Sequence, residues 1–355
     1  MSFILPNLVD LANQPFDSII DVRSPSEFAE DHIPGAVNLP VLSDEERAEV
    51  GTIYVQDSPF RARKLGAALV ARNAACHLEG PLADRDGGWR PLVYCWRGGQ
   101  RSGSFASILA QIGWRVEVLA GGYQSYRRAV VDMLYAQPVR HRIVLLDGHT
   151  GTGKTEVLQR IQAMGHQVLD LEGLANHRGS VLGPCEGGQP SQKTFESHIA
   201  MVLAETDVDL PLFVEAESSK VGERLVPPQL WTAMRRAPRI RLEAGPDDRA
   251  AYLARAYQDL TAEPDVLMDR LAKLLPFVGR ERLGEWETLV QRGAFEALAR
   301  DLIARHYDAR YAKSVKHRPA EERISVSLSP DGLAAAARAV VEKAGMLETC
   351  TDQIG

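Results

Sequence analysis

Hydrophobic and polar positions in the first part of the chain follow two patterns: short apolar runs typical of buried parallel strands, and longer stretches with helical spacing. The apolar runs that predict strands lie at residues 18–22, 91–94 and 116–119. The stretches that predict helices lie at residues 60–72, 103–113 and 123–136. This alternation of strand and helix predicts an α/β domain with a parallel sheet.

The same alternation starts again after Pro138, which interrupts the last helical stretch. An apolar run at 141–146 leads into a glycine-rich loop, and the stretch from 247 to 310 has mainly helical spacing. Further predicted strands lie at 167–171, 212–215 and 239–243. We therefore predict two domains, at residues 1–137 and 138–355, the second being an α/β domain with a helical C-terminal region.

Composition narrows the class of protein. With 355 residues, 45% of them hydrophobic and 25% charged, the chain has the size of two globular domains and not the composition of a disordered protein. No apolar run approaches the roughly 20 residues that cross a bilayer, and the first ten residues lack the Lys or Arg of a secretory signal. We expect a cytoplasmic protein with no membrane partner. The formal net charge of −6 argues against a strongly basic nucleic-acid protein but leaves room for a local basic patch.

A phosphate-binding loop follows the first predicted strand of the second domain. It matches G-x-x-x-x-G-K-[ST] and precedes a helical run at 156–163. Its residues are Gly148, His149, Thr150, Gly151, Thr152, Gly153, Lys154 and Thr155. Backbone N–H groups of such a loop surround phosphate oxygens at a helix N-terminus, Lys154 adds a positive charge, and the Thr155 hydroxyl can hold Mg²⁺. The motif predicts a phosphate-bearing ligand without identifying it.

Carboxylates at strand ends are candidates to complete this site. Glu215 and Glu217 end or follow one predicted strand, where a carboxylate that holds a metal-bound water usually lies, and Asp170 ends another. Strand-end carboxylates that merely face solvent have the same pattern. We predict an acidic group here but no dedicated metal site.

Cys95 follows a predicted strand and opens a loop that leads into a predicted helix. The remaining loop residues are Trp96, Arg97, Gly98, Gly99, Gln100, Arg101 and Ser102. In such a loop the backbone amides, the helix N-terminus and Arg101 stabilise a thiolate and bind an anion. Cys95 is therefore the candidate nucleophile, although an inert cysteine in a noncatalytic copy of the fold gives the same pattern. The other cysteines lack such surroundings, and their spacing suits neither a metal site nor a disulfide framework: Cys76, Cys185 and Cys350.

The first 137 residues resemble a rhodanese domain. Besides the Cys95 loop, the resemblance rests on Asp21, Val22 and Arg23, on Glu27, Phe28, His32, Ile33, Pro34, Gly35, Ala36 and Asn38, and on Gly121 and Gly122. In that family the loop cysteine carries a persulfide or a related chalcogen adduct. Here Cys95 and Arg101 enclose five residues, whereas sulfurtransferases of this fold usually enclose four. The wider loop suits a larger anion, as in the related phosphatases, so sulfur, selenium and phosphate all have to be weighed.

Along nearly its full length the chain resembles the bacterial tRNA 2-selenouridine synthases. Beyond the Cys95 loop and the phosphate loop, the resemblance rests on residues 170–175, 177–180, 189–192, 195–196, 215–222, 306–308 and Tyr311. It implies an enzyme that replaces sulfur by selenium at position 2 of the wobble uridine in certain tRNAs. It also implies an S-geranylated intermediate, with geranyl diphosphate as the first co-substrate and selenophosphate as the second. The partner is then a tRNA that carries a 2-thiolated wobble uridine.

The implied chemistry suits the two loops. A thiocarbonyl sulfur leaves poorly, whereas its alkylated form leaves readily as a thiol, so prenylation before substitution is reasonable. We expect the loop 148–155 to hold the diphosphate of the prenyl donor, since the sequence offers no evident base that would activate water there. We expect Cys95 to receive selenium or to assist its delivery, with Arg97 and Arg101 binding the oxyanion of selenophosphate.

A basic segment near the end of the helical region is the candidate tRNA-binding surface. Its residues are Arg305, Tyr307, Arg310, Tyr311, Lys313, Lys316 and Arg318. Cations with interleaved aromatic side chains suit phosphate contacts and base stacking, although a solvated basic helix face has the same composition. A second candidate group comprises Arg235, Arg236, Arg239 and Arg241.

Two rival interpretations stay open from the residues alone. The first is a rhodanese-type sulfurtransferase or phosphatase coupled to a P-loop kinase, which would act without tRNA. The second is a binding module, in which an inactive rhodanese domain docks a partner and the phosphate loop works as a nucleotide switch.

Overall fold

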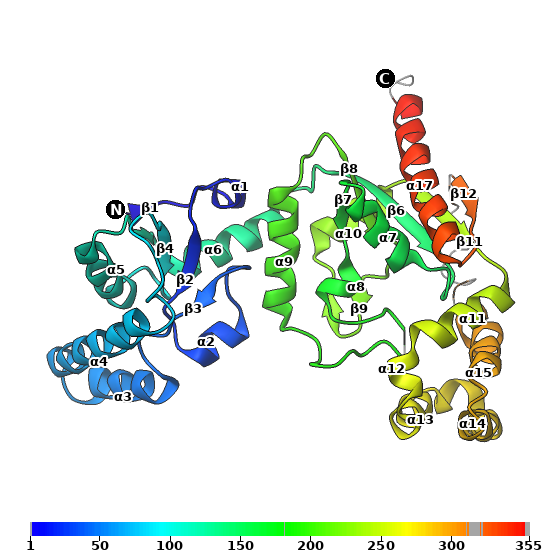
Figure 1. Cartoon of the computed structure of the whole chain (residues 1–355), viewed down its shortest axis with the longest axis horizontal. Coiled ribbons are helices and arrows are strands. Elements are labelled where there is room, and N and C mark those ends of the chain that lie inside the picture. Colours follow the sequence, from blue (N-terminus) through cyan, green and yellow to red (C-terminus); the bar gives the residue numbers. More distant parts are fainter. Residues whose placement is uncertain (1, 181, 310, 312–319, 321, 352–355) are drawn as a thin grey trace. The chain divides into compact units, whose positions relative to one another are not determined.

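In the computed structural model, which describes residues 2–180, 182–309, 311, 320 and 322–351, the chain forms two compact units (Figure 1). The first comprises residues 1–137 and 191–205, and the second comprises 138–190 and 206–355. Residues 191–205 thus belong to the first unit, although we predicted them within the second domain. No helix in the described ranges is long and apolar enough to cross a membrane.

The first unit is built on a five-stranded parallel sheet in the order β1-β5-β4-β2-β3. The strands are β1 (Ser2–Phe3), β2 (Ser18–Asp21), β3 (Val37–Asn38), β4 (Pro91–Tyr94) and β5 (Glu117–Leu119). The helices are α1 (Leu8–Ala12), α2 (Pro25–Glu30), α3 (Asp44–Gln56), α4 (Pro59–Glu79), α5 (Gln100–Ile112), α6 (Gly122–Val131), the π-helical turn η1 (Asp132–Ala136) and α9 (Gln192–Glu205). The parallel sheet with its helices confirms the predicted α/β class.

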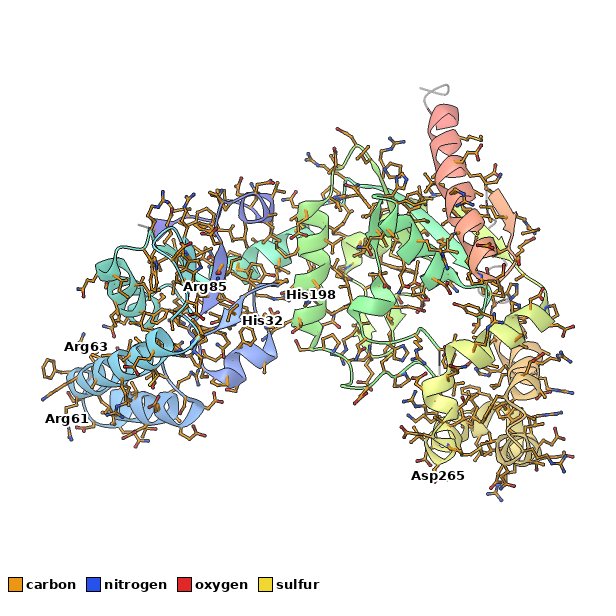
Figure 2. All side chains as sticks on the ribbon, viewed as in Figure 1. His32, Arg61, Arg63, Arg85, His198 and Asp265 are labelled. Carbon is orange, nitrogen blue, oxygen red and sulfur yellow. The ribbon has the colours of Figure 1, made fainter. Side chains whose placement is uncertain are left out.

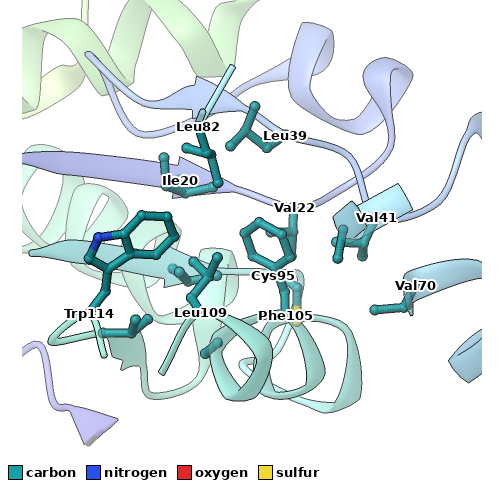
Figure 3. Packing of buried hydrophobic residues seen from close by; sticks show 14 of the residues in the cluster. Ile20, Val22, Leu39, Val41, Val70, Leu82, Cys95, Phe105, Leu109 and Trp114 are labelled. Atoms are coloured by element: carbon teal, nitrogen blue, oxygen red, sulfur yellow. The ribbon is translucent and has the colours of Figure 1, made fainter. Parts of the chain in front are cut away.

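The core of the first unit reaches the end of its central strand. β4 is buried along its whole length, as an unbroken apolar run predicts for a parallel strand covered on both faces. Ile20, Val93, Phe105 and Leu109 belong to one apolar cluster. Figure 3 shows Cys95 beside Phe105 in the same cluster. The candidate nucleophile is therefore anchored in the core.

Helix α9 belongs to the first unit although its neighbours in the sequence belong to the second. It packs against α1, α6 and η1. Ser197 donates a hydrogen bond to Asp31 at 3.0 Å, and Glu196 accepts hydrogen bonds from Arg127 and, at 2.6 Å, from Tyr135. Ser197, Glu196 and Asp31 are all buried. The buried Ser197–Asp31 pair holds the helix in place because neither partner can return to water without separating the elements.

The second unit has a parallel sheet in the order β12-β11-β6-β8-β7 and a separate two-stranded antiparallel pair. The main strands are β6 (Arg142–Gly148), β7 (Gln167–Leu169), β8 (Pro211–Glu215), β11 (Arg239–Glu243) and β12 (Glu322–Ser325). The pair is β9 (Lys220–Val221) with β10 (Arg224–Leu225). The strand predicted at 167–171 ends at Leu169, because the Asp170 side chain accepts the Gly173 N–H and caps a short helix.

Helices cover this sheet and extend beyond it. α7 (Lys154–Ala163) and α17 (Pro330–Thr351) pack together against the sheet (Figure 1). The others are α8 (Leu171–Leu174), α10 (Pro228–Arg236), α11 (Pro246–Ala256), α12 (Gln258–Thr261), α13 (Pro264–Ala272), α14 (Leu275–Gln291), α15 (Phe295–Leu302) and the π-helical turn η2 (Ile303–Tyr307). The helices from α12 to η2 share an apolar cluster that includes the fully buried Trp286. This is the helical region that the spacing from 247 onward predicts.

Candidate functional site

The cysteine loop runs from the end of β4 to the start of α5, and two glycines set its shape. Gly98 and Gly122 both have positive φ, 65° and 58°. A Cβ atom at Gly98 would lie 2.5 Å from the carbonyl oxygen of Leu119, and one at Gly122 would lie 2.3 Å from that of Cys95. Only glycine at both positions lets the turn before α6 close onto the cysteine loop.

Cys95 is buried at the centre of this loop, next to Ser102 in the first turn of α5. The Ser102 hydroxyl donates a hydrogen bond to Sγ at 3.1 Å. Burial by itself would raise the pKa of the Cys95 thiol, but the Ser102 hydroxyl and N–H, the charge of Arg101 and the Gly99 N–H together outweigh it. The net result is a pKa below the ordinary value, as a reactive thiolate requires.

Arg101 is held in place by Glu27, a residue that the sequence alone does not single out as a partner. Nη1 and Nη2 of Arg101 donate to the two oxygens of Glu27 at 2.7 and 3.3 Å. Glu27 is buried and also caps α2 together with Ser24. Burial opposes its ionisation, yet the hydrogen bonds and charge of Arg101 keep the pKa of Glu27 below its ordinary value. Arg97, in contrast, is exposed.

A hollow of about 340 Å³ lies beside this loop. Gln100, Arg101 and Ser104 form one wall, and α4 contributes Arg63, which is labelled in Figure 2. Arg63 and Arg101 thus add positive charge to a recess whose other walls are mainly apolar, and Arg101 is paired with Glu27. Of the predicted loop residues, Gly99, Arg101 and Ser102 lower the pKa of Cys95, whereas Arg97 is exposed.

The phosphate loop connects β6 to α7 as the motif predicts. Gly153 precedes α7 with φ 74°, and the Lys154 ammonium donates to the Gly148 carbonyl at 3.0 Å. The Thr152 hydroxyl donates to the His149 carbonyl at 2.8 Å. These contacts bring the predicted residues 148–155 into one turn at the N-terminus of a ten-residue helix.

The buried Glu215 and the half-buried Glu172 meet the end of this loop. The Thr155 hydroxyl lies 2.9 Å from Oε1 of Glu215 and 3.2 Å from Oε2 of Glu172. Burial raises the pKa of both carboxyl groups, and neighbouring negative charges raise it further. The charge of Glu217 raises the pKa of both Glu172 and Glu215. The charge of Glu215 also raises that of Glu172, and the charge of Asp170 raises that of Glu215. A positive charge beside Thr155 would therefore be favoured.

The acidic group differs from the predicted one in one member. Asp170, Glu172 and Glu217 line the same cavity as the loop, and Glu215 lies behind them. Glu172, which the sequence alone does not single out, lies in the short helix α8 and joins the group only through the fold. Within the described ranges, no three or more His, Cys, Asp or Glu side chains form a group that could hold a metal by themselves. A divalent cation here would need phosphate oxygens from a ligand as well.

An ion-pair chain supports the phosphate loop from behind. Arg249 donates to the Thr150 carbonyl at 3.2 Å and pairs with Asp308 at 2.7 Å. The same Asp308 accepts from Nδ1 of His149 at 2.8 Å. Asp308 lies in the segment predicted to bind tRNA. Part of that segment therefore contacts the phosphate loop and its supporting arginine instead.

The prediction of a second tRNA-binding surface is wrong for the two arginines of β11. Arg239 and Arg241 are buried, and Arg241 pairs with Asp147 of β6 at 3.0 Å. They therefore cannot form an exposed basic patch. Arg235 and Arg236, at the end of α10, are exposed.

The described residues of the predicted basic segment also have internal partners. Tyr311 donates to Asp147 at 2.8 Å, and Tyr307 packs on the apolar cluster of the helical region. Arg305 is exposed but pairs with Asp301 at 3.0 Å. The other predicted residues lie outside the described part of the chain: Arg310, Lys313, Lys316 and Arg318.

The phosphate loop opens into a polar cavity of about 550 Å³. Asn176, His177, Arg178 and Ser180 contribute to its wall, together with Tyr252 and Tyr257. A narrow apolar hollow of about 40 Å³ adjoins it, and the two share Thr150, Leu253 and Tyr257. The rest of the hollow is lined mainly by leucines and Phe295 of the helical region. A ligand held by the loop thus has apolar surface within reach.

Comparisons with known proteins cover both units. Residues 6–129 match the family described as "Rhodanese-like domain", and residues 141–271 match "tRNA 2-selenouridine synthase AAA domain". The chain is similar to proteins named "tRNA 2-selenouridine synthase" from three bacteria. It is 37% identical to that of Hahella chejuensis over 67% of this chain and 63% of the relative. It is 33% identical to that of Cupriavidus pinatubonensis over 85% of this chain and 90% of the relative. It is 30% identical to that of Shewanella denitrificans over 87% of this chain and 83% of the relative.

Proposed function

The chain belongs to the tRNA 2-selenouridine synthase family, and from this premise we propose that it converts a 2-thiolated wobble uridine of tRNA into 2-selenouridine in two steps. The first step uses geranyl diphosphate and gives an S-geranyl intermediate, and the second uses selenophosphate. The observation that carries the proposal is that one chain holds two candidate anion-binding loops, one of which contains a cysteine with a lowered pKa. Two different anionic donors require two such sites, and a tRNA substrate places the enzyme in the cytoplasm.

The phosphate loop is the proposed site for geranyl diphosphate. Its backbone amides and Lys154 would neutralise the diphosphate as the thiocarbonyl sulfur of the base attacks C1 of the prenyl group and the C–O bond breaks. The apolar hollow that shares Leu253 and Tyr257 with the phosphate cavity supports a donor with a hydrocarbon tail over a nucleotide. Filling it with a ten-carbon chain requires the surrounding side chains to move, because it is narrow.

Mg²⁺ fits the proposed diphosphate site. Thr155, Glu172 and Glu215 offer only oxygen atoms, which this ion prefers, and each carboxyl group has a raised pKa that a cation would lower. When bound, the ion would neutralise charge on the departing diphosphate. The side chains of these three residues would hold it together with the ligand's phosphate oxygens.

The Cys95 thiolate could attack selenophosphate at selenium or at phosphorus, and the two routes give different products. If the thiolate attacked selenium in selenophosphate, the P–Se electron pair would stay on phosphorus and phosphite would form. If it attacks phosphorus, selenide leaves, Cys95 carries a phosphoryl group that water later removes, and selenide displaces geranylthiolate from C2 of the base. We favour the second route, because five residues separate Cys95 from Arg101, as in related phosphatases, and Ser102 lies 3.1 Å from Sγ.

Two substitutions in the full chain test the proposal. We expect Lys154→Ala to slow geranylation about 10- to 100-fold, the loss typical of a charge-assisted contact, while selenation of tRNA geranylated beforehand continues. We expect Cys95→Ala to accumulate geranylated tRNA and form no 2-selenouridine. Mass analysis of the wobble nucleoside, after incubation with 2-thiolated tRNA and both donors, reports both steps at once.

Three results would contradict the proposal. The first is wild-type protein that binds ATP but not geranyl diphosphate. The second is Cys95→Ala protein that still forms 2-selenouridine but no longer geranylates. The third is phosphate release from ATP or a phosphopeptide that proceeds without tRNA, which would favour the kinase or phosphatase alternative.

A further inference from the structure

A second hollow in the first unit shares no lining residue with the recess that contains Arg63. It measures about 330 Å³ and is lined by Trp96, Tyr123, Gln124, Arg127, Arg128 and Lys193. We call it the Trp96 hollow. Two of its residues are aromatic and three are cationic, and its lining holds no carboxylate, whereas that of the phosphate cavity holds four.

The aromatic wall of the Trp96 hollow is rigid. Trp96 is half-buried and stacks on Tyr123, with ring centroids 5.3 Å apart and ring planes 29° from parallel. The Tyr123 hydroxyl donates to the buried Asp31 at 2.7 Å, and the Arg23 guanidinium lies 4.1 Å from its ring centroid. A fixed aromatic face loses little conformational entropy on binding, and it stacks with any nucleobase.

The cations of the hollow outnumber the carboxylates that contact them. Lys193 pairs with Glu30 at 2.5 Å and Arg127 pairs with Glu196. Arg128 is exposed on α6 and has no ion-pair partner among the described side chains. The exposed Arg97 is the next residue after Trp96 and adds a further positive charge to the same loop. The excess charge suits a phosphodiester backbone.

Backbone hydrogen bonds join the hollow to the candidate nucleophile. The Tyr123 N–H donates to the Cys95 carbonyl at 2.8 Å, and the Gln124 N–H donates to the Trp96 carbonyl at 3.1 Å. The backbone of Tyr123 and Gln124, which line the hollow, is therefore fixed relative to the backbone of Cys95 and Trp96. An enzyme that changes an atom of a base ring must first take that base out of its stack.

We propose that the Trp96 hollow binds an unstacked nucleotide of the anticodon loop, with its base against Trp96 and its backbone phosphates on Arg128 and Lys193. The inference rests on the proposed function, since it names the surface that presents RNA to Cys95. Lys193 lies in α9, so the surface is complete only where α9 joins the first unit. It replaces no part of the predicted basic segment at 305–318, which lies in the other unit.

Binding measurements on the full chain test this surface. The probe is a fluorescent anticodon stem-loop RNA with 2-thiouridine at the wobble position, titrated at several salt concentrations. We expect Arg128→Glu to weaken binding about tenfold or more and to reduce the slope of log K against log salt by about one. We expect Trp96→Ala to weaken binding about 10- to 100-fold with the slope unchanged, because stacking releases no counterions.

The matched control is Arg72→Glu, which makes the same charge change at an exposed position of α4 in the same unit. It should bind RNA as the wild type does. If Arg72→Glu weakens binding as much as Arg128→Glu, binding follows overall charge and the inference is wrong. Thermal melting checks that each variant is folded.

Photo-crosslinking gives a second, direct readout. An RNA with 5-iodouridine at the wobble position should crosslink to a peptide that contains Trp96 or Tyr123. Crosslinks confined to the second unit, or variants that bind RNA like the wild type, would overturn the inference. Wild-type protein that binds no RNA and forms no modified nucleoside would instead overturn the proposed function, so the two failures are distinguishable.

Discussion

At the scale of single residues, Cys95 is a buried thiol whose neighbours lower its pKa. Burial alone favours the neutral thiol, as it does for most core cysteines. The Ser102 hydroxyl at 3.1 Å and the charge of Arg101 reverse that preference. Glu27 fixes Arg101 with two hydrogen bonds, so the charge acts from a constant position. The lowered pKa of Cys95 thus depends on these three neighbouring residues.

This arrangement predicts the pH dependence of Cys95. Replacing Arg101 with Gln removes a charge that lowers the pKa of the thiol, so the thiolate forms at higher pH than in the wild type. The ascending limb of Cys95 alkylation by iodoacetamide, a neutral reagent, should shift to higher pH, with the largest loss of rate at low pH. Mass spectrometry of the Cys95 peptide separates this signal from the other cysteines.

Arg97→Gln is the control for this experiment. Arg97 lies in the same loop but is exposed, and its charge is not among those that lower the pKa of Cys95. Its alkylation profile should match the wild type. A profile of Arg101→Gln that also matches would mean that backbone and hydroxyl hydrogen bonds alone set the pKa.

At the scale of elements, α9 is the least predictable part of the fold. Its sequence lies between β7 and β8 of the second unit, yet it completes the first. Its contacts with that unit include polar ones, among them Glu196 with Arg127 and Ser197 with Asp31. Hydrophobic periodicity does not reveal such partners, because they depend on where two distant segments meet.

The position of α9 predicts which unit a substitution in it destabilises. Removing the Glu196 carboxylate breaks its hydrogen bonds with Arg127 and Tyr135, so Glu196→Ala should lower the stability of the first unit by about 1–3 kcal/mol. Hydrogen exchange should rise in residues 122–137 and 192–205, while β6 and β8 keep their protection. Glu205→Ala, exposed at the end of the same helix, should change neither. Increased exchange confined to the second unit would contradict the assignment of α9.

At the scale of the whole molecule, the two candidate sites lie in separate units. Cys95 and its recess use only residues of the first unit, and the phosphate loop with its cavity uses only residues of the second. Under the proposed function each unit carries out one half of the reaction, and geranylated tRNA passes from one step to the next.

This division predicts complementation between inactive variants. Neither Cys95→Ala nor Lys154→Ala should give 2-selenouridine efficiently from 2-thiolated tRNA. An equal mixture of both should restore its formation to within a few-fold of the wild type after a lag, because the geranylated tRNA released by the first variant is a substrate for the second. Nucleoside mass analysis over time checks this. A mixture that stalls at geranylated tRNA would show that the intermediate does not leave the protein.

The sequence by itself determined the parts of this protein whose structure is local. The phosphate loop, the Cys95 loop and the parallel strands around them follow from short stretches of glycine, apolar and helix-forming residues, since the backbone geometry of a loop between strand and helix depends on residues that adjoin it. The α/β class follows from the same alternation. The resemblance to a known family also predicted a tRNA-modifying activity. The comparisons show that the chain belongs to that family.

Only the tertiary structure decided which distant residues meet. Strand register placed Arg241 beside Asp147 and so buried an arginine that the sequence alone would leave exposed. Chain topology brought Glu172 and Glu215 to one hydroxyl, Glu27 to Arg101, and Lys193 to Trp96. Each pair is separated by tens of residues, and its formation depends on the packing of whole elements, which local spacing does not encode.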